Sequence, residues 1–231
     1  MVYFTGDIHG IPWKITKFAS KMKLTNIDTI VILGDVGANY FLDERDADMK
    51  LHLNTIGVDI LCIHGNHEIR PSNIPSYHLQ TWNGGKVWVE EKYPHLKFAR
   101  DGEIYDIEGK RYIAIGGAYS IDKYYRLARG YGWWEDEQPS EEIKAFVEKQ
   151  LSGKEFDVIL SHTCPYTYEP TEMFLSGIDQ SMVDTSTEEW LDSIEKGYYY
   201  KEWLCGHWHT DKCVNRIHFL FNTWETADNL L

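Results

Sequence analysis

Short apolar runs alternate with polar segments of helical character through the first third of the chain. The apolar runs are rich in β-branched side chains, a glycine follows each within two residues, and they cover residues 2–5, 28–33 and 58–63. Runs that are apolar on both faces are typical of buried strands in a parallel sheet. Residues 12–23 and 43–54 predict the intervening helices, with Asp43 as an N-cap. This alternation predicts a parallel sheet with helices on its faces.

The middle of the chain changes to shorter predicted strands, at 86–90, 96–99, 103–107 and 110–115. Glu108-Gly109 predicts a hairpin turn between the last two of them. The next segment, 119–139, is rich in Tyr, Trp, Arg and Gly and shows no clear period. It predicts an irregular insertion over the functional site.

The last third again alternates between helices and strands. Ser140 and Thr187 are the predicted N-caps of helices at 140–151 and 187–196. The other predicted segments are strands at 156–160 and 200–205, a long polar loop at 163–186 and a closing strand at 213–222. Because repeats, linkers and low-complexity tracts are absent from the sequence, we expect a single domain over residues 1–231.

Five of the predicted strands end in short loops that carry metal-ligand side chains. These loops are Gly6-Asp7-Ile8-His9-Gly10, Gly34-Asp35, Gly65-Asn66-His67-Glu68, Ser161-His162 and Gly206-His207-Trp208-His209. In open α/β sheets, ligands bind at the carboxyl ends of the strands. The sequence therefore predicts that these polar groups meet at one edge of the molecule, where the glycines permit tight turns and close backbone approach.

The donor atoms in these loops are oxygen and nitrogen, without sulfur. The set comprises two carboxylates, one amide and four imidazoles: Asp7, Asp35, Asn66, His9, His162, His207 and His209. Such donors suit Mn, Fe, Zn or Co rather than Ca²⁺ or a structural zinc. Seven donors exceed what one site uses alongside open positions, so we predict two ions that share a bridging carboxylate. None of the four cysteines forms a CxxC pair, and we interpret them as small buried hydrophobes.

The five loops, in this order, resemble the five sequence blocks of the calcineurin-like metallophosphoesterases. The resemblance spans residues 3–209, and each block follows a predicted strand. It implies an α/β fold in which a two-sheet β-sandwich is flanked by helices in α-β-β-α layers. In that fold the hairpin strands of the middle and the closing strand would build the second sheet.

The resemblance also implies a role for each donor. One ion would be held by Asp7, His9 and His209, and the other by Asn66, His162 and His207, with Asp35 as the bridge. A metal-bridging hydroxide would attack phosphorus in line with the leaving oxygen. The ions would be two divalent or trivalent transition-metal ions, and Mn²⁺ is the one that we expect to support activity in vitro.

His67 follows Asn66 directly and is not one of the seven donors. In the family, this histidine stabilises the transition state or protonates the leaving alkoxide, so His67 is the predicted catalytic residue. Asn39 and Glu68 are both candidates for orienting it, and the sequence does not decide between them.

The chain departs from the phosphoprotein-phosphatase branch of this family around the second and third blocks. The run Gly34-Asp35-Val36-Gly37-Ala38-Asn39 has Ala38 in place of that branch's aspartate and Asn39 in place of its phosphate-binding arginine, and His64 replaces the arginine before Gly65. A phosphate dianion is well served by arginines, so their absence favours a diester substrate. The predicted substrate contacts are Arg70, Asn39 and His64.

Two features of the aromatic insertion leave alternatives open. Arg126 and Arg129, like Arg70, are either phosphate contacts or solvated surface charges, and the second interpretation is favoured. The aromatic residues either line a substrate pocket or pack the insertion onto the core; they are Tyr119, Tyr124, Tyr125, Tyr131, Trp133 and Trp134.

Net charge limits the partners. The formal net charge of −13 repels polyanions, so we expect neither tight nucleic-acid binding nor association with anionic membranes. The chain opens without a signal peptide and has no apolar run of about 20 residues, from which we expect a cytoplasmic location. The sequence does not indicate the oligomeric state.

The sequence therefore predicts an enzyme, a dinuclear-metal-dependent phosphoester hydrolase acting on a small or nucleotide-like phosphodiester. The alternatives are a phosphomonoesterase or protein phosphatase, a nuclease, and a non-catalytic metal-binding scaffold. All seven donors and His67 are present, which argues against the scaffold.

Overall fold

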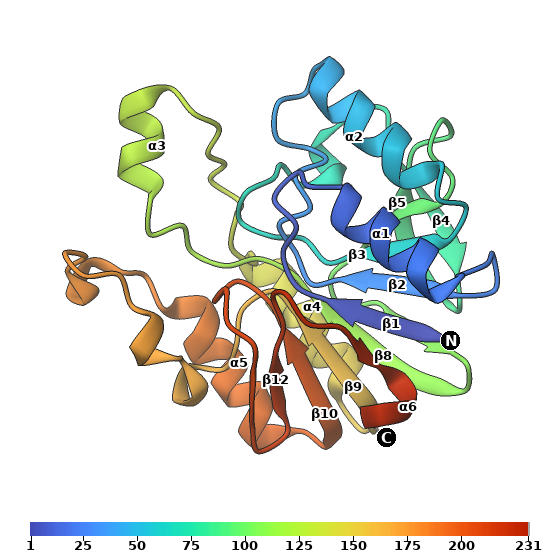
Figure 1. Ribbon diagram of the computed structural model, residues 1–231. Helices are drawn as coiled ribbons and strands as arrows, with labels where there is room; N and C mark the ends of the chain where they lie inside the picture. The colour runs from blue at the N-terminus through green and yellow to red at the C-terminus, as the bar shows by residue number, and fades with distance from the viewer. Residues whose placement is uncertain (231) are drawn as a thin grey trace.

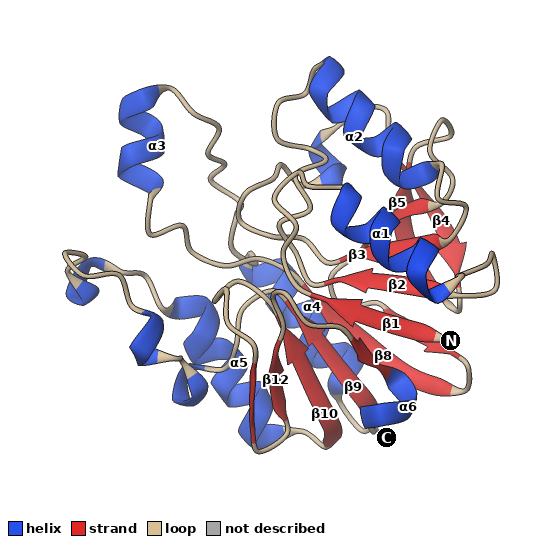
Figure 2. Cartoon of the chain, viewed as in Figure 1, coloured by secondary structure: helices blue, strands red, loops and turns tan. Residues whose placement is uncertain are grey.

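Two mixed β-sheets pack face to face, and helices cover the outer face of each sheet (Figures 1 and 2). The computed structural model describes residues 1–230, and Leu231, the last residue of the predicted domain, lies outside them. The prediction of an α/β fold with two sheets flanked by helices is confirmed.

The first sheet is built almost entirely from the first hundred residues. Its strands lie in the order β13-β1-β2-β3-β6-β5-β4. The four central strands are parallel: β1 (Val2–Thr5), β2 (Thr29–Ile32), β3 (Asp59–Cys62) and β6 (Leu96–Ala99). Antiparallel pairing adds the edge strands β5 (Gly85–Val89), β4 (His78–Trp82) and β13 (Glu225–Thr226).

The second sheet is built from residues 104–219, in the order β11-β12-β10-β9-β8-β7. Its parallel strands are β8 (Lys110–Ile115), β9 (Phe156–Ser161), β10 (Tyr200–Cys205) and β12 (Ile217–Phe219), and its antiparallel edges are β7 (Ile104–Ile107) and β11 (Lys212–Val214). At the β7–β8 turn, Glu108 and Gly109 have φ of 54° and 72°. Two successive positive φ angles are those of a tight hairpin turn, as their sequence predicts.

Alternate residues of each strand face different layers, because successive side chains of a strand point to opposite sides. In β2 and the residue after it, Val31 and Leu33 pack against the second sheet, whereas Ile30 and Ile32 pack under the helices of the first sheet. Those helices are α1 (Trp13–Met22) and α2 (Glu44–Asn54). The second sheet is covered by α4 (Glu141–Leu151) and α5 (Ser186–Gly197).

Two of the three predicted helix caps are present. The Asp43 carboxylate accepts a hydrogen bond from the Arg45 backbone N–H at 2.9 Å, and Ser140 Oγ accepts one from the Ile143 N–H at 3.3 Å. The prediction for Thr187 was wrong, because α5 begins at Ser186. The Thr187 hydroxyl instead donates to Gln138 Oε1 at 2.7 Å.

Other local predictions also need correction. The segment 119–139 contains a helix, α3 (Lys123–Arg129), which stands apart from the sheets between two extended connections (Figure 1). The predicted strand 213–222 is instead the β11–β12 hairpin, because Asn215 turns the chain with φ of 56°. The elements that were not predicted are β4, β13, α6 (Ala227–Leu230) and four 3₁₀ turns at Pro71–Asn73, Tyr166–Tyr168, Thr171–Met173 and Gln180–Met182.

No helix within residues 1–230 is long and apolar enough to cross a membrane.

Candidate metal centre

The loops that follow five parallel strands converge where the two sheets meet. Donors from the first sheet follow β1, β2 and β3, and donors from the second sheet follow β9 and β10; they are Asp7, His9, Asp35, Asn66, His162, His207 and His209. Convergence arises because the parallel strands of a sheet deliver their carboxyl ends to one edge.

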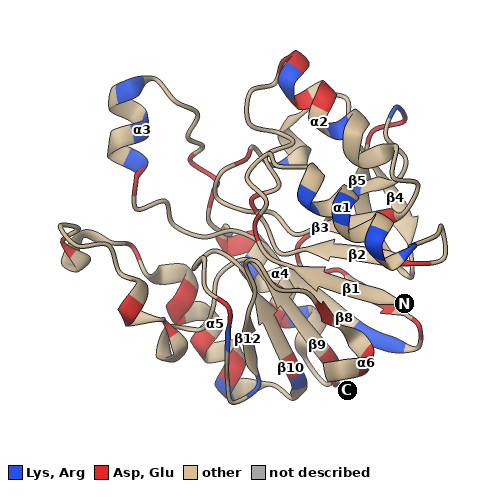
Figure 3. Ribbon diagram, in the orientation of Figure 1, with Lys and Arg blue, Asp and Glu red and all other residues tan. Residues whose placement is uncertain are grey.

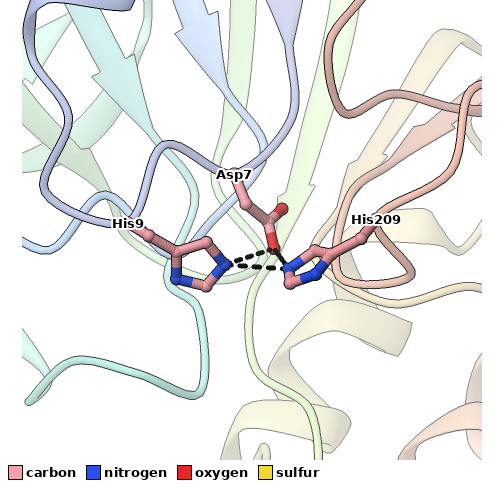
Figure 4. A group of neighbouring side chains, drawn as sticks. All are labelled: Asp7, His9 and His209. Carbon is pink, nitrogen blue, oxygen red and sulfur yellow. Dashed lines mark hydrogen bonds and ion pairs between the residues drawn. The ribbon is translucent and has the colours of Figure 1, made fainter. Parts of the chain in front are cut away.

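One group of donors consists of Asp7, His9 and His209, whose ligand atoms all lie within 4.8 Å of one another (Figure 4). The Nε2 atoms of His9 and His209 are 2.8 Å apart. Asp7 Oδ2 lies 3.3 Å from His209 Nε2 and 3.7 Å from His9 Nε2. Three donor atoms from two loops, one after β1 and one after β10, therefore face a single point.

A second group forms around the side-chain oxygen of Asn66. Asn66 Oδ1 lies 2.9 Å from His162 Nε2 and 3.1 Å from His207 Nδ1. Asp35 stands between the groups: its Oδ2 is 3.9 Å from His9 Nδ1, and its Oδ1 is 3.5 Å from His162 Nε2. The carboxylate of Asp35 thus faces donors of both groups.

Two glycines make this approach sterically feasible. A Cβ atom on Gly65 would lie 2.1 Å from Asp35 Oδ1, and one on Gly206 would lie 2.3 Å from Asp7 Oδ1. Both distances are far inside van der Waals contact, so any larger residue would displace a donor carboxylate.

Four donor residues adopt the left-handed backbone conformation, which is uncommon for residues other than glycine. Their φ angles are 42° for His9, 47° for Asp35, 63° for His207 and 49° for His209. Such strain persists only where the surrounding structure enforces it, and it is concentrated at functional sites.

Hydrogen bonds around the donors fix their orientation. His162 Nδ1 lies 2.7 Å from the Leu33 carbonyl, to which it can only donate, and this leaves Nε2 without a proton in the neutral ring. Asp7 Oδ1 accepts the His207 backbone N–H at 2.9 Å, and Asp35 Oδ1 accepts the His67 N–H at 2.8 Å. Each carboxylate therefore has its direction set by a backbone amide.

The protonation of these groups suits metal binding. Burial would raise the pKa of Asp7, but the hydrogen bond from His209 and the nearby histidines outweigh it and lower that pKa. Burial lowers the pKa of His207 well below its usual value. The hydrogen bond to Asp7 raises the pKa of His209. A metal ion would replace the proton that His209 shares with Asp7.

The donor set fits a pair of transition-metal ions on chemical grounds. Ring nitrogens of His9 and His209 face each other at hydrogen-bond distance, and Asn66 Oδ1 faces two more. Mixed imidazole and carboxylate donors at such spacing bind Mn, Fe, Zn or Co. These clusters are suited to binding a divalent metal ion.

His67 lies beside the donors, and its neighbour is neither of the two predicted residues. His67 Nε2 is 4.0 Å from Oδ1 of Asp122, in the insertion before α3. Asn39 instead accepts a hydrogen bond from the Tyr77 hydroxyl at 3.0 Å, and buried Glu68 accepts the Gly65 N–H at 3.2 Å. Burial lowers the pKa of His67, whereas the charges of Asp35 and Asp122 act in the opposite direction.

One feature of the sequence could have identified Asp122 as the neighbour of His67. Asp122 is the only acidic residue between Tyr119 and Tyr131, in a segment predicted to cover the site. What the sequence could not supply is the path that brings it to His67.

Residues of the insertion also form hydrogen bonds with Asn66. Asn66 Nδ2 donates to Ser120 Oγ at 2.9 Å, and Ser120 Oγ donates to Glu137 Oε2 at 2.5 Å. Arg126, which is 1% exposed, donates to Ser120 Oγ at 2.9 Å and to the Asn66 carbonyl at 3.4 Å. The interpretation of Arg126 as a solvated charge was wrong, because this buried network contains it.

A cavity of about 380 Å³ opens over the donors. Its inner wall contains His9, Asp35, Asn66, His67, His207 and His209. Its outer wall contains Tyr119, Ile121, Asp122, Glu169, Met173, Phe174, Leu175, Gln180, Val183, Asp184, Thr185, Glu188 and Trp208. The outer wall thus comes from the start of the insertion, from the segment 169–188 and from Trp208. Of the aromatic residues that the sequence offered as pocket walls, Tyr119 lines the cavity, whereas Tyr124, Tyr125 and Tyr131 are exposed elsewhere.

The three predicted substrate contacts do not line this cavity. Arg70 pairs with Asp101 at 2.5 Å and donates to the Asp136 carbonyl at 2.7 Å. His64 is buried, and it lines a second cavity of about 230 Å³ together with Arg70. Asn39 is fully buried. The structure brings the seven donors and His67 together but places these three residues away from them.

Comparison with known proteins gives the following matches. The family model of the calcineurin-like phosphoesterases matches residues 1–211. The crystal structure of TT1561 from Thermus thermophilus is similar over 89% of this chain and 80% of its own, with a TM-score of 0.50 and 14% identity. AQ665 from Aquifex aeolicus, described as a protein of unknown function, matches 73% of this chain and 81% of its own, with a TM-score of 0.35 and 14% identity. No curated protein sequence matches the chain.

At 14% identity, the similarity to TT1561 concerns the fold alone. The family model covers most of the chain and contains all seven donors and His67. On that match, the chain belongs to the calcineurin-like phosphoesterase family, whose fold and metal-dependent phosphoester hydrolysis agree with the two-sheet sandwich and the donor clusters described above.

Proposed function

We propose that this protein is a phosphodiesterase that uses two transition-metal ions to hydrolyse small phosphodiesters. The observation that carries the proposal is the position of Asp35 between two groups of donors. Asp7, His9 and His209 form one group, and Asn66, His162 and His207 form the other.

When bound, two such ions would polarise the phosphoryl oxygens and lower the pKa of an attacking water molecule. His67 lines the cavity beside the donors, and there it would hydrogen-bond the leaving oxygen and pass it a proton. Asp122 would favour the charged form of His67 against the effect of burial. The apolar residues of the outer wall would exclude water around the ester.

The charges of the cavity support a diester rather than a monoester. Within the described residues 1–230, its lining contains four carboxylates besides Asp35 but neither Lys nor Arg, and those four are Asp122, Glu169, Asp184 and Glu188. A monoester dianion brings one more negative charge than a diester and would find no arginine to bind it. Polyanionic nucleic acids meet the same obstacle, which argues against a nuclease.

Turnover of bis-p-nitrophenyl phosphate and p-nitrophenyl phosphate with Mn²⁺ tests the proposal. We expect the diester to be hydrolysed with the higher kcat/KM, and a clear preference for the monoester would favour a phosphomonoesterase instead. In Asp35→Asn, we expect turnover to be lost and metal stoichiometry to fall, since this side chain faces both donor groups. Full metal loading without turnover of any phosphoester would indicate a non-catalytic scaffold.

A further inference from the structure

The outer part of the cavity combines an aromatic wall with carboxylates. The Phe174 ring stacks on Trp208, with ring centroids 5.8 Å apart and an interplanar angle of 27°. Trp208 in turn meets the donor His207 edge to face, with centroids 5.3 Å apart. The aromatic wall therefore begins directly beside the metal donors.

Glu188 is the most deeply buried acid of the outer wall. It lies in the first turn of α5, it is 4% exposed, and its Oε2 makes no close hydrogen bond, although the Thr163 hydroxyl lies near enough to lower its pKa. Burial raises the pKa of Glu188 to about 7, and it raises that of Glu169, also in the cavity wall, to about 7. A buried carboxylate without a partner is costly unless a ligand supplies one.

The surroundings of Glu188 add negative charge and no positive charge. Asp184 and Asp122 line the same cavity, and Figure 3 shows acidic residues along α5. The Arg126 guanidinium of α3 lies 3.7 Å from Asp122. Among residues 1–230, the cavity lining contains neither Lys nor Arg, and its histidines lie at the metal donors. A cationic ligand would supply Glu188 with the opposite charge that the lining does not place beside it.

We propose that this outer subsite binds a cationic, apolar substituent of the phosphodiester, of the alkylated ammonium class. The proposal rests on the phosphodiesterase function proposed above. The phosphate would lie at the donors, and the ammonium group would lie against Phe174 and Trp208 with Glu188 at its side.

The chemistry of the subsite matches this class of ligand. Aromatic faces attract alkylated ammonium groups through the ring quadrupole, and the methyl or methylene groups bury apolar surface. Carboxylates supply the opposite charge at short range. The same carboxylates would repel a second phosphate, so nucleotides with extended phosphate chains are disfavoured.

Two p-nitrophenyl diesters of equal shape test the charge requirement. One carries a 2-(trimethylammonio)ethyl group, and the other carries the neutral 3,3-dimethylbutyl group. With Mn²⁺-loaded protein, we expect kcat/KM for the cationic diester to exceed that for the neutral one by about tenfold. Equal turnover, or a preference for the neutral diester, would overturn the proposal.

A matched pair of variants assigns the preference to the subsite. Glu189 follows Glu188 on the same helix, but it is exposed and does not line the cavity. We expect the preference for the cationic diester to fall toward one in Glu188→Gln and to keep its wild-type value in Glu189→Gln. An equal decrease in both variants would mean that the preference for the cationic diester arises from the overall negative charge of α5, and it would contradict the proposal.

A binding measurement separates this proposal from the function on which it rests. Trp208 lines the subsite, so its fluorescence should respond to choline at lower concentration than to 3,3-dimethylbutanol. This readout needs no turnover. If choline binds selectively but no diester is hydrolysed, only the phosphodiesterase function is contradicted. If diesters are hydrolysed but choline does not bind selectively, only the subsite is contradicted.

Discussion

His67 has a ring nitrogen within 4.8 Å of ligand atoms of His9 and Asp35, and its side chain also approaches a carboxylate of the insertion. His67 Nε2 lies 4.0 Å from Asp122 Oδ1, and the residue lines the cavity. If His67 acts in proton transfer and not as a ligand, its loss should reduce turnover without removing an ion.

For His67→Ala, we expect kcat to fall by about 10²–10⁴-fold, the usual contribution of a positioned acid or base. Metal content, measured by elemental analysis, should stay at the wild-type stoichiometry. Loss of one ion would instead identify His67 as a ligand.

Asp122 should affect the pKa at which His67 loses its proton. Its charge raises the pKa of His67, so Asp122→Asn should lower that pKa. If His67 acts in its protonated form, activity is lost as pH rises through this pKa, and the descending limb of the kcat/KM profile should move to lower pH. Glu135→Gln, which removes an exposed charge of the same insertion, is the control. An unchanged limb in Asp122→Asn would exclude Asp122 from the role.

How far the sequence predicts a residue of this site depends on what positions it. The positions of Asp7, Asp35 and His162 could be predicted, because each follows a buried strand whose end is fixed by the sheet. The positions of Asp122 and Glu188 could not, because their proximity to the site depends on the paths of long connections that carry no hydrophobic period. The favoured interpretation of Arg70 as a solvated charge was wrong, because Arg70 is buried against Asp101, a partner that is 31 residues away in sequence.

At the scale of elements, hydrogen bonds connect the insertion to the metal centre. Ser120 and Glu137, on opposite sides of α3, hold the side-chain nitrogen of Asn66 so that its oxygen points toward His162 and His207. Hydrogen-bonded partners of metal ligands orient those ligands and strengthen metal binding.

We therefore expect Ser120→Ala to weaken the binding of one of the two proposed ions by about 10–100-fold. Calorimetric titration of the metal-free protein with Mn²⁺ would measure the two affinities separately. Arg129→Ala, on the exposed side of α3, should leave both unchanged. Equal weakening of both ions in Ser120→Ala would point to general loosening of the fold.

The elements themselves were predicted where local chemistry determines them. Asp43 and Ser140 cap their helices as their sequence indicates, and the apolar runs became the central strands. The helix α3 was missed because its residues expose Tyr124, Tyr125 and Leu127 and show no buried face at helical spacing. The β11–β12 hairpin was missed because its turn is marked in the sequence by Asn215 alone, and a single residue is a weak turn signal.

At the scale of the whole molecule, the buried acids of the cavity should make stability depend on pH. The pKa of Glu188 is about 7 in the folded protein and 4.5 ordinarily. The folded protein therefore keeps a proton that the unfolded chain releases, so stability falls as pH rises from about 4.5 to about 7.

Glu188→Gln removes the carboxyl group that causes this loss of stability at higher pH. We expect the variant to be more stable than the wild type at pH 8, by up to about 3 kcal/mol, and equally stable near pH 4. Urea unfolding in the presence of a chelator would measure both values, with Glu189→Gln as the control. A stability difference that is the same at both pH values would contradict the assignment.

The division of the donors between the sheets has a consequence for the integrity of the chain. Each proposed ion would draw ligands from both sheets, since Asp7 and His9 follow β1 whereas His209 follows β10, and Asn66 follows β3 whereas His162 follows β9. Because one sheet comes mostly from the first half of the chain and the other from the second, each ion would act as a cross-link between two halves of the polypeptide. A chain cut once in the exposed segment 127–131 would then stay together in Mn²⁺ and separate more readily in a chelator.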